Sequence, residues 1–275
     1  MESRADSSQD ADLELLAASA REAGRLAMTF FGRDPRAWMK GGDSPVTEAD
    51  IAVDELLRRR LQAARPDYGW LSEETADDPA RLLAPRIFVV DPIDGTRGFI
   101  EGDRRWCVSI AVVAAGRPVA AALFAPALDV LFTAIAGFGA RRDGKPIAAS
   151  SRARLEGAHI AGPKSWFGSK AMKALPTRRA DYVPSLALRF AFVADGTFDA
   201  AFASPRSQDW DLAACDLLVH EAGGALTELD GQKPLYNRER LSHDVLAAGG
   251  REIQPELLAL VGEVALERRR AGLSV

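Results

Sequence analysis

The stretch that decides the fold reads "VVDPIDGTRGFI" and spans residues 89–100. It begins with apolar, β-branched residues typical of a buried strand, and two aspartates follow directly. Pro92 has no backbone N–H with which to continue a strand ladder, so we expect the strand to end at Asp91 and the chain to turn there. The turn would bring Asp94 to the same end of the sheet as Asp91, where both carboxylates can reach one cation.

Magnesium suits this pattern, because Mg²⁺ prefers oxygen ligands from a few carboxylates, waters and substrate phosphate. The carbonyl of Ile93, exposed by the turn, is another candidate ligand. Gly95 and Thr96 then open a predicted short helix, and free N–H groups at a helix start bind phosphate. The alternative is a turn without further function, since Asp-Pro and Asp-Gly are common turn dipeptides.

Helix and strand patterns follow one another irregularly along the first half of the chain. Apolar residues at helical spacing predict a helix over about 11–31. Thr47, with Asp50 three residues later, predicts the capped start of a second helix. The strands predicted in this half are "GWLSEET" (69–75), "RIFVVD" (86–91) and about three within 106–147.

The second half mixes short strands with helices, among them "DWDLAACDLLVHE" (209–221) and a final helix from Pro255. No regular βαβ rhythm is present, so a layered α+β fold is expected rather than a doubly wound sheet. The predicted organisation is a disordered tail over 1–10, an N-terminal half over 11–150 with most of the candidate metal ligands, and a C-terminal half over 151–275.

Composition excludes several classes of protein. The 275 residues carry a net charge of −4, so no broad basic field exists to attract a nucleic acid polymer. No stretch reaches the roughly 20 apolar residues that span a bilayer, and the polar, acidic start argues against a targeting peptide. Cys107 and Cys215 fit neither a disulfide framework nor a CxxC metal pattern. We therefore expect a cytoplasmic protein without membrane insertion.

Carboxylates that could carry chemistry occur at four junctions between predicted elements: Asp50, Glu73–Glu74, Asp91 with Asp94, and Asp211. Each has a plainer interpretation when it is taken alone. Asp50 is a capping partner for Thr47, the glutamate pair is a solvated charge pair, and Asp211 is a favourable charge at a helix start. The three histidines are scattered and suggest neither nucleophilic nor zinc chemistry.

Taken together, these stretches resemble the inositol monophosphatase superfamily of Mg²⁺-dependent, lithium-sensitive phosphomonoesterases. The matching motifs are "KGGDSPVTEAD" (40–50), "LSEET" (71–75), "VVDPIDGT" (89–96), "WDLAA" (210–214) and "EAGG" (221–224). The resemblance implies an αβαβα sandwich that acts on a small phosphorylated metabolite, as a monomer or homodimer. It also implies two or three Mg²⁺ ions per site, with Mn²⁺ as a substitute and Li⁺ as an inhibitor.

The resemblance assigns roles position by position. Glu73, Asp91 and the Ile93 carbonyl would hold a first Mg²⁺; Asp91, Asp94 and Asp211 a second; and Glu73, with Glu74 through water, a third and weaker ion. Asp50 and Thr96 would orient and deprotonate the attacking water, and Glu74 counts with them as catalytic. The predicted substrate contacts are Gly95, Thr96, Arg97, Ser185, Arg206 and Asp211.

The choice of substrate rests on fewer residues. Arg97, followed by Gly-Phe-Ile, resembles the bacterial 3′(2′),5′-bisphosphate nucleotidase branch, and Arg206 could meet a second phosphate. Ser204 stands where inositol phosphatases usually carry a glutamate that holds inositol hydroxyls, which counts against inositol phosphate. Inositol phosphate and histidinol phosphate are nevertheless alternatives with the same mechanism. A non-catalytic regulatory protein that binds metal and phosphate is the alternative of another class.

Overall fold

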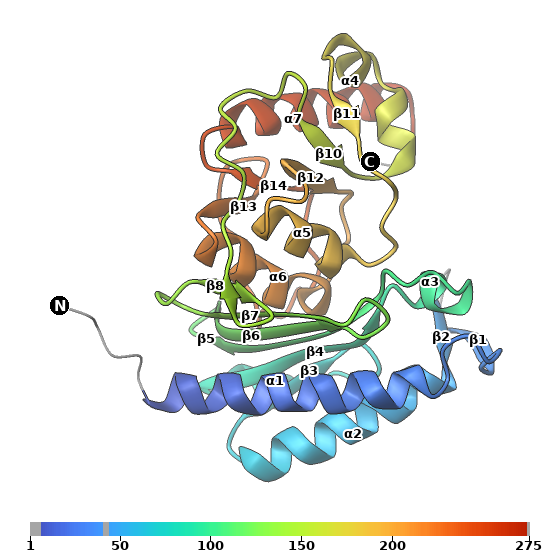
Figure 1. Ribbon diagram of the computed structural model, residues 1–275, viewed down its shortest axis with the longest axis vertical. Coiled ribbons are helices and arrows are strands. Elements are labelled where there is room, and N and C mark those ends of the chain that lie inside the picture. Colours follow the sequence, from blue (N-terminus) through green and yellow to red (C-terminus); the bar gives the residue numbers. More distant parts are fainter. Residues whose placement is uncertain (1–6, 41–43, 274–275) are drawn as a thin grey trace.

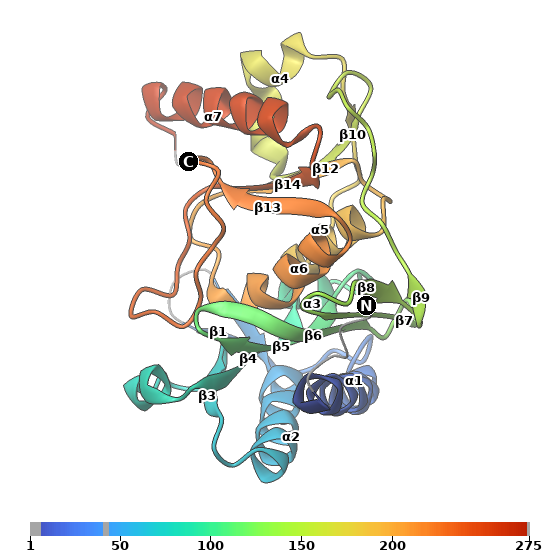
Figure 2. The same cartoon turned by 90° about the vertical axis from the view of Figure 1, so that its left-hand side faces the viewer.

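Five layers of helices and sheets make up the protein (Figure 1). The computed structural model describes residues 7–40 and 44–273. Figure 2 shows two helices at the bottom, then a seven-stranded sheet, two helices, a five-stranded sheet and a last helical layer. The helices of these three layers are α1 (Ser7–Met28) with α2 (Glu48–Ala64), α5 (Leu186–Ala194) with α6 (Asp209–Glu221), and α4 (Lys170–Ala174) with α7 (Gln254–Arg270). This is the predicted αβαβα sandwich.

The seven-stranded sheet keeps its strands in chain order. All neighbours are antiparallel except the first two, which are parallel. The strands are β3 (Gly69–Ser72), β4 (Arg86–Asp94), β5 (Cys107–Ala114), β6 (Arg117–Ala125), β7 (Val130–Ile135), β8 (Ala140–Arg142) and β9 (Lys145–Pro146). A separate hairpin, which the sequence did not predict, precedes α2 and consists of β1 (Ala37–Lys40) and β2 (Ser44–Thr47).

Both faces of this sheet are buried, which explains the continuous apolar run in β4. Ile87 and Val89 belong to the core shared with α5 and α6, whereas Phe88 and Val90 belong to the core beneath α1 and α2. Side chains alternate between the faces of a strand, so a strand covered on both sides reads as unbroken hydrophobicity. The end of β4 is thereby held firmly between two helical layers.

The five-stranded sheet has the order β11-β10-β12-β14-β13 and mixes parallel with antiparallel pairs. Its strands are β10 (His159–Ala161), β11 (Arg178–Arg179), β12 (Ala200–Ala203), β13 (Gly224–Glu228) and β14 (Leu246–Gly250). The remaining short helices are α3 (Thr96–Ile100), η1 (Pro79–Leu83) and η2 (Lys164–Gly168). Among the ranges that the structure describes, no helix is both long and apolar enough to cross a membrane.

The first helix differs from its predicted bounds at both ends. It begins at Ser7, so the last four residues of the expected ten-residue tail are helical, and residues 1–6 lie outside the described ranges. It also ends three residues early, at Met28 rather than near residue 31. Turns continue from Thr29 to Gly32, whose φ of 71° lies in the left-handed region that favours glycine. The proposed division of the chain near residue 150 stays a prediction.

Candidate active site

β4 carries a bulge where the sequence predicted its end. The strand continues through Pro92 to Asp94, and its pairing with β5 shifts register, with Asp91 opposite Ser109 and Asp94 opposite Cys107. Over this stretch β4 therefore holds one residue more than its partner. The bulge accommodates the ladder bond that Pro92 cannot donate. The prediction that the strand ends at Asp91 is wrong for this reason.

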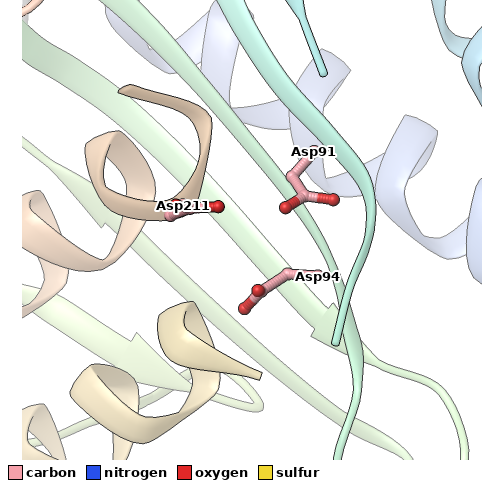
Figure 3. A group of neighbouring side chains, drawn as sticks. All are labelled: Asp91, Asp94 and Asp211. Carbon is pink, nitrogen blue, oxygen red and sulfur yellow. The ribbon is translucent and has the colours of Figure 1, made fainter. Parts of the chain in front are cut away.

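The bulge places two carboxylates on one side of the sheet. In a regular strand, residues three apart point to opposite faces, so one inserted residue turns Asp91 and Asp94 to the same face. Asp211, from the first turn of α6, completes a group in which one oxygen of each carboxylate lies within 4.8 Å of the others. Figure 3 shows these three side chains, hereafter the acidic cluster, turned toward one another. The structure thus brings together ligands predicted from two distant motifs.

Asp211 is fixed by the cap of its own helix. One of its oxygens, Oδ2, accepts a hydrogen bond of 2.7 Å from the backbone N–H of Gln208, the N-cap residue of α6. Its charge at the start of a helix is also favoured by the helix dipole. Asp211 is therefore a favourable charge at a helix start, as its plainer interpretation holds. The cap bond orients the carboxylate and leaves its second oxygen free of that bond.

Asp94 is held by the start of α5 from the second half of the chain. Its carboxylate accepts hydrogen bonds from the Ser185 hydroxyl and from the backbone N–H groups of Leu186 (3.3 Å) and Ala187 (2.6 Å). Burial raises the pKa of Asp94, and these donors partly offset the rise. The Ser185 hydroxyl thus supports Asp94 inside the protein, and its contact with substrate stays a prediction.

A glycine is required at position 95, where the chain turns from β4 into α3 close to the start of α5. Its φ is 96°, and a Cβ there would lie 3.0 Å from the backbone nitrogen of Ser185. Any other residue would be strained at this φ and would push α3 away from α5. Gly95 is the N-cap of α3 and Thr96 is its first residue. Their N–H groups, which were predicted to bind phosphate, directly follow Asp94 of the acidic cluster.

Asp50 serves two purposes at once. Its Oδ2 accepts from the backbone N–H (2.8 Å) and the hydroxyl (2.6 Å) of Thr47, which forms the predicted capping box of α2. Its Oδ1 lies 3.0 Å from the hydroxyl of Thr96, which is also 3.0 Å from the carbonyl oxygen of Ile93. A carbonyl oxygen has two lone pairs, so this contact leaves Ile93 able to accept a second partner. The predicted Asp50–Thr96 pair is present in the structure.

Glu73 and Glu74 follow β3 and point their charges into the same region. The ammonium group of Lys40 bonds Oε2 of Glu74 at 2.8 Å and also the backbone carbonyl of Glu73. The side chain of Glu73 lines a pocket with Asp211. The two glutamates are therefore a tethered pair within the site and not a freely solvated one.

Burial, and after it repulsion between neighbouring carboxylates, raises the pKa values of the acidic groups in the site. Burial raises the pKa of Glu73 to about 8, and the charges of Asp211 and Glu74 add to the rise. Burial and then repulsion from Asp94 raise the pKa of Asp211 to about 7. Burial, followed by the charges of Glu73 and Asp94, holds the pKa of Asp91 well above the usual carboxyl range. Within the described residues the acidic cluster forms no salt bridge, so its charge is uncompensated by a protein cation at contact distance.

A pocket of about 460 Å³ opens beside the cluster. It is lined by Lys40, Ser44, Glu73, Arg206, Gln208, Trp210 and Asp211. Of the predicted substrate contacts, Arg206 and Asp211 therefore lie at the pocket, whereas Arg97 is exposed on α3 and is not among its lining residues. Lys40 and Trp210 also line the pocket, and the sequence patterns assigned neither of them a role. Both stand in motifs that contain candidate ligands, and that position was the signal that could have identified them.

Comparison with protein families decides the assignment. The sequence matches the model of the inositol monophosphatase family over residues 9–266. The chain belongs to the inositol monophosphatase family. The resemblance expected from the motifs is confirmed, and the protein is a phosphatase that acts on phosphate monoesters.

Solved structures of this family share the fold. The extragenic suppressor protein suhB from Bartonella henselae superposes with a TM-score of 0.81 at 30% identity, covering 91% of this chain and 98% of that one. An IMPase from Thermotoga maritima gives a TM-score of 0.82 at 29% identity, with 94% and 98% covered. Both confirm the layered α+β architecture.

Relatives with assigned names act on different phosphate esters. A histidinol-phosphatase of Mycobacterium tuberculosis is 37% identical and covers 80% of this chain and 88% of its own length. Inositol monophosphatase 2 of Solanum lycopersicum is 32% identical, with 78% and 86% covered. A 3′(2′),5′-bisphosphate nucleotidase CysQ of Aggregatibacter actinomycetemcomitans is 30% identical, with 80% and 85% covered. Similarity alone therefore leaves the substrate of this inositol monophosphatase homologue open.

The acidic cluster fits a divalent cation. Three carboxylates from the ends of two elements offer hard oxygen donors, the kind that Mg²⁺ and Mn²⁺ prefer. Burial raises the pKa of all three carboxyl groups, and repulsion from neighbouring carboxylates adds to the rise for Asp91 and Asp211. A bound cation would relieve that repulsion, so the residues present suit the metal that the family implies.

Proposed function

We propose that this phosphatase is Mg²⁺-dependent and that its substrate is a 3′(2′),5′-bisphosphate nucleotide, with adenosine 3′,5′-bisphosphate hydrolysed to AMP. The observation that carries the chemistry is the acidic cluster beside the hydrogen bond between Asp50 and Thr96. The preference for a second phosphate rests on Arg206 at the pocket.

The ligand residues divide between three ions in this proposal. Glu73, Asp91 and the Ile93 carbonyl would hold one Mg²⁺, the acidic cluster a second, and Glu73 with Glu74 a weaker third. When bound, the ions neutralise the phosphate and lower the pKa of a water molecule enough for attack. Phosphate esters need this help because both reaction partners are anionic.

The chain itself receives the proton and holds the phosphate. The Thr96 hydroxyl donates to Oδ1 of Asp50, so the lone pairs of its oxygen are free to accept from the attacking water. Burial raises the pKa of Asp50, which makes it a better base than an exposed aspartate. The N–H groups of Gly95 and Thr96 would donate to phosphate oxygens.

Arg206 favours a substrate with a second phosphate. Its exposed side chain lines the pocket with Glu73 and Asp211 and has no side-chain partner within the described ranges. Its backbone, with a φ of 81°, is held by a 2.8 Å hydrogen bond from its N–H to the carbonyl of His243. A guanidinium group binds phosphate through two parallel N–H bonds. Trp210, also at the pocket, offers an aromatic face for a nucleotide base.

Histidinol phosphate is the second candidate, because the relative from Mycobacterium tuberculosis at 37% identity carries that name. Its ammonium group would be repelled by Arg206, whereas Lys40 is already paired with Glu74. Inositol phosphate is disfavoured by Ser204, which offers one hydroxyl where a carboxylate would hold two inositol hydroxyls. Arg206 therefore supports the bisphosphate over histidinol phosphate, and Ser204 supports it over inositol phosphate.

A substrate panel tests the proposal. Phosphate release from adenosine 3′,5′-bisphosphate, inositol 1-phosphate and histidinol phosphate is measured at saturating Mg²⁺. The nucleotide should give the highest kcat/KM of the three, and a higher value for either other ester would overturn the substrate assignment. Inhibition by Li⁺ and activity with Mn²⁺ would test only the metal class. Cytoplasmic location and a monomeric or homodimeric state stay predictions.

A further inference from the structure

Asp54 is a buried carboxylate outside the predicted metal ligands. It lies on α2 one turn after Asp50 and is 7% exposed. Its two oxygens accept hydrogen bonds from the two hydroxyls that flank the Glu73–Glu74 pair. Oδ1 accepts from Ser72, and Oδ2 accepts from Thr75 at 2.7 Å. The Asp54 carboxylate is therefore hydrogen-bonded to the residue immediately before and the residue immediately after the two glutamates.

The two hydroxyls also accept hydrogen bonds from neighbouring N–H groups. Because each hydroxyl has one proton, which it gives to Asp54, its lone pairs are left to accept. The Ser72 oxygen accepts from the backbone N–H of Glu74 at 3.4 Å, and the Thr75 oxygen accepts from the indole N–H of Trp70 at 3.3 Å. Because the Asp54 carboxylate accepts both hydroxyl protons and the two N–H groups can only donate, all four hydrogen bonds have a fixed direction.

One rigid helix thereby links two parts of the site. Asp50, at the start of α2, holds the Thr96 hydroxyl, and Asp54 holds the turn that carries Glu73 and Glu74. The backbone N–H of Glu73 adds a 3.2 Å bond to the carbonyl of Val90 on β4, next to Asp91. The turn is thus pinned between α2 and the strand that bears the acidic cluster.

We propose that Asp54 is a positioning residue for metal binding, which sets the Glu73–Glu74 turn so that its carboxylates can share cations with the acidic cluster. This inference rests on the proposed Mg²⁺ dependence. Residues that orient metal ligands typically contribute about 10–100-fold to metal affinity. Asp54 touches neither phosphate nor water in this role, so its loss should weaken metal binding while the chemical step survives at saturating metal.

The substitution Asp54→Asn tests the role with little change in shape. An amide group must donate to one of the two hydroxyls. That hydroxyl's own proton then loses its acceptor, and its oxygen has to accept both from the amide and from the N–H of Glu74 or of Trp70. Calorimetric titration with Mg²⁺ alone should show a dissociation constant raised at least about tenfold. The Mg²⁺ concentration for half-maximal activity should rise in parallel, with kcat and the substrate KM at saturating Mg²⁺ within about threefold of wild type.

Glu55→Gln is the matched control. Glu55 is the neighbouring residue on α2 and is exposed. Its substitution removes the same unit of charge as Asp54→Asn. Its metal affinity should equal that of the wild type. An equal loss of affinity in both variants would overturn the proposal, because the effect would then come from net charge.

Thr75 provides a second route if Asp54→Asn does not fold. Thr75→Val removes the hydroxyl and leaves Asp54 in place, whereas Thr75→Ser keeps the hydroxyl. The valine variant should bind Mg²⁺ more weakly and the serine variant like the wild type. Unchanged affinity in the valine variant, or a drop in kcat without a change in affinity in Asp54→Asn, would overturn the positioning role. A wild type that neither binds Mg²⁺ nor needs it for turnover would instead refute the proposed function.

Discussion

The hydroxyl of Thr96 lies 3.0 Å from Oδ1 of Asp50, while the other oxygen of the same carboxylate accepts both hydrogen bonds from Thr47 in the helix cap. The cap thus orients the carboxylate that would receive the proton. A residue that looks like a structural cap in the sequence is also placed for catalysis, because its two oxygens have separate partners.

Asp50→Asn should lower kcat at saturating Mg²⁺ by about 10²–10⁴-fold with little change in stability. The amide oxygen can still accept the cap bonds, but the amide nitrogen would face Thr96 and could not take its proton. The comparison variant is Thr47→Ala, which loses one bond to Oδ2 of Asp50 and keeps the backbone one; it should cost about 1 kcal/mol of stability and lower kcat far less than Asp50→Asn. Steady-state kinetics and thermal unfolding of both variants separate the two roles, and a loss of less than about tenfold in Asp50→Asn would contradict the proton-acceptor role.

Asp94→Asn should abolish Mg²⁺-dependent turnover. The substitution removes a cluster charge and presents an amide nitrogen to the backbone N–H of either Ala187 or Leu186, both of which donate to the Asp94 carboxylate. Asp103→Asn is the matched control, since Asp103 is partly exposed and pairs only locally with Arg105. Phosphate release at saturating Mg²⁺ measures both, and near-wild-type turnover of Asp94→Asn would rule out its role as a ligand.

Without metal, stability should fall as the pH rises from about 4 to about 8. The folded-state pKa values of Glu73 and Asp211, about 8 and about 7, lie above those of an unfolded chain, about 4. The folded protein therefore binds these protons more tightly, and the stability they contribute is complete below the unfolded pKa and is lost as the pH passes the folded pKa. Mg²⁺ binds the deprotonated groups, so it should restore more stability at alkaline pH.

Thermal unfolding with EDTA and with Mg²⁺, at about pH 6 and about pH 8.5, measures this linkage. The rise in Tm on adding Mg²⁺ should be larger at the higher pH. Glu73→Gln should flatten the pH dependence of the EDTA-treated protein, because it removes one raised carboxyl group. An equal or smaller Mg²⁺ effect at the higher pH would contradict the electrostatic account of the site.

Arg206→Gln should act on the substrate preference. The KM for adenosine 3′,5′-bisphosphate should rise by roughly 10–100-fold, since a charged hydrogen-bonded contact is worth about 1.5–3 kcal/mol. The KM for inositol 1-phosphate, which has no second phosphate, should stay within about threefold. Arg154→Gln serves as the control, because Arg154 is exposed, pairs with Glu256 and is not among the pocket residues. Equal losses for both substrates in Arg206→Gln would show that Arg206 does not read a second phosphate.

Much of the fold could be predicted because its signals are local. The run of Ile87 to Val90 predicted a buried strand, and the Thr47–Asp50 pair predicted the start of α2, where both the cap and the helix were found. The β1–β2 hairpin was missed, since its Gly- and Pro-rich sequence resembles a loop. The bulge at Pro92 was missed as well, because it depends on pairing with β5 that no local pattern reveals.

The candidate site was predictable for a different reason. Asp91, Asp94 and Asp211 each lie at a junction between elements, and their motifs identified them before the structure brought them within reach of one another. Their supports could not be predicted: Ser185 reaches Asp94 from a segment some ninety residues away, and Asp54 reaches the Glu73–Glu74 turn across a helix–strand contact. Such contacts are decided by tertiary packing alone.

In the proposed function, clustered carboxylates bind the metal that drives phosphate release. The most direct measurement is the rate of phosphate release from adenosine 3′,5′-bisphosphate by the wild-type protein, first stripped of metal with EDTA and then titrated with Mg²⁺. The stripped protein should show no turnover, and activity should return to a plateau as Mg²⁺ is added. Turnover that persists after metal removal and does not respond to Mg²⁺ would contradict the proposed function.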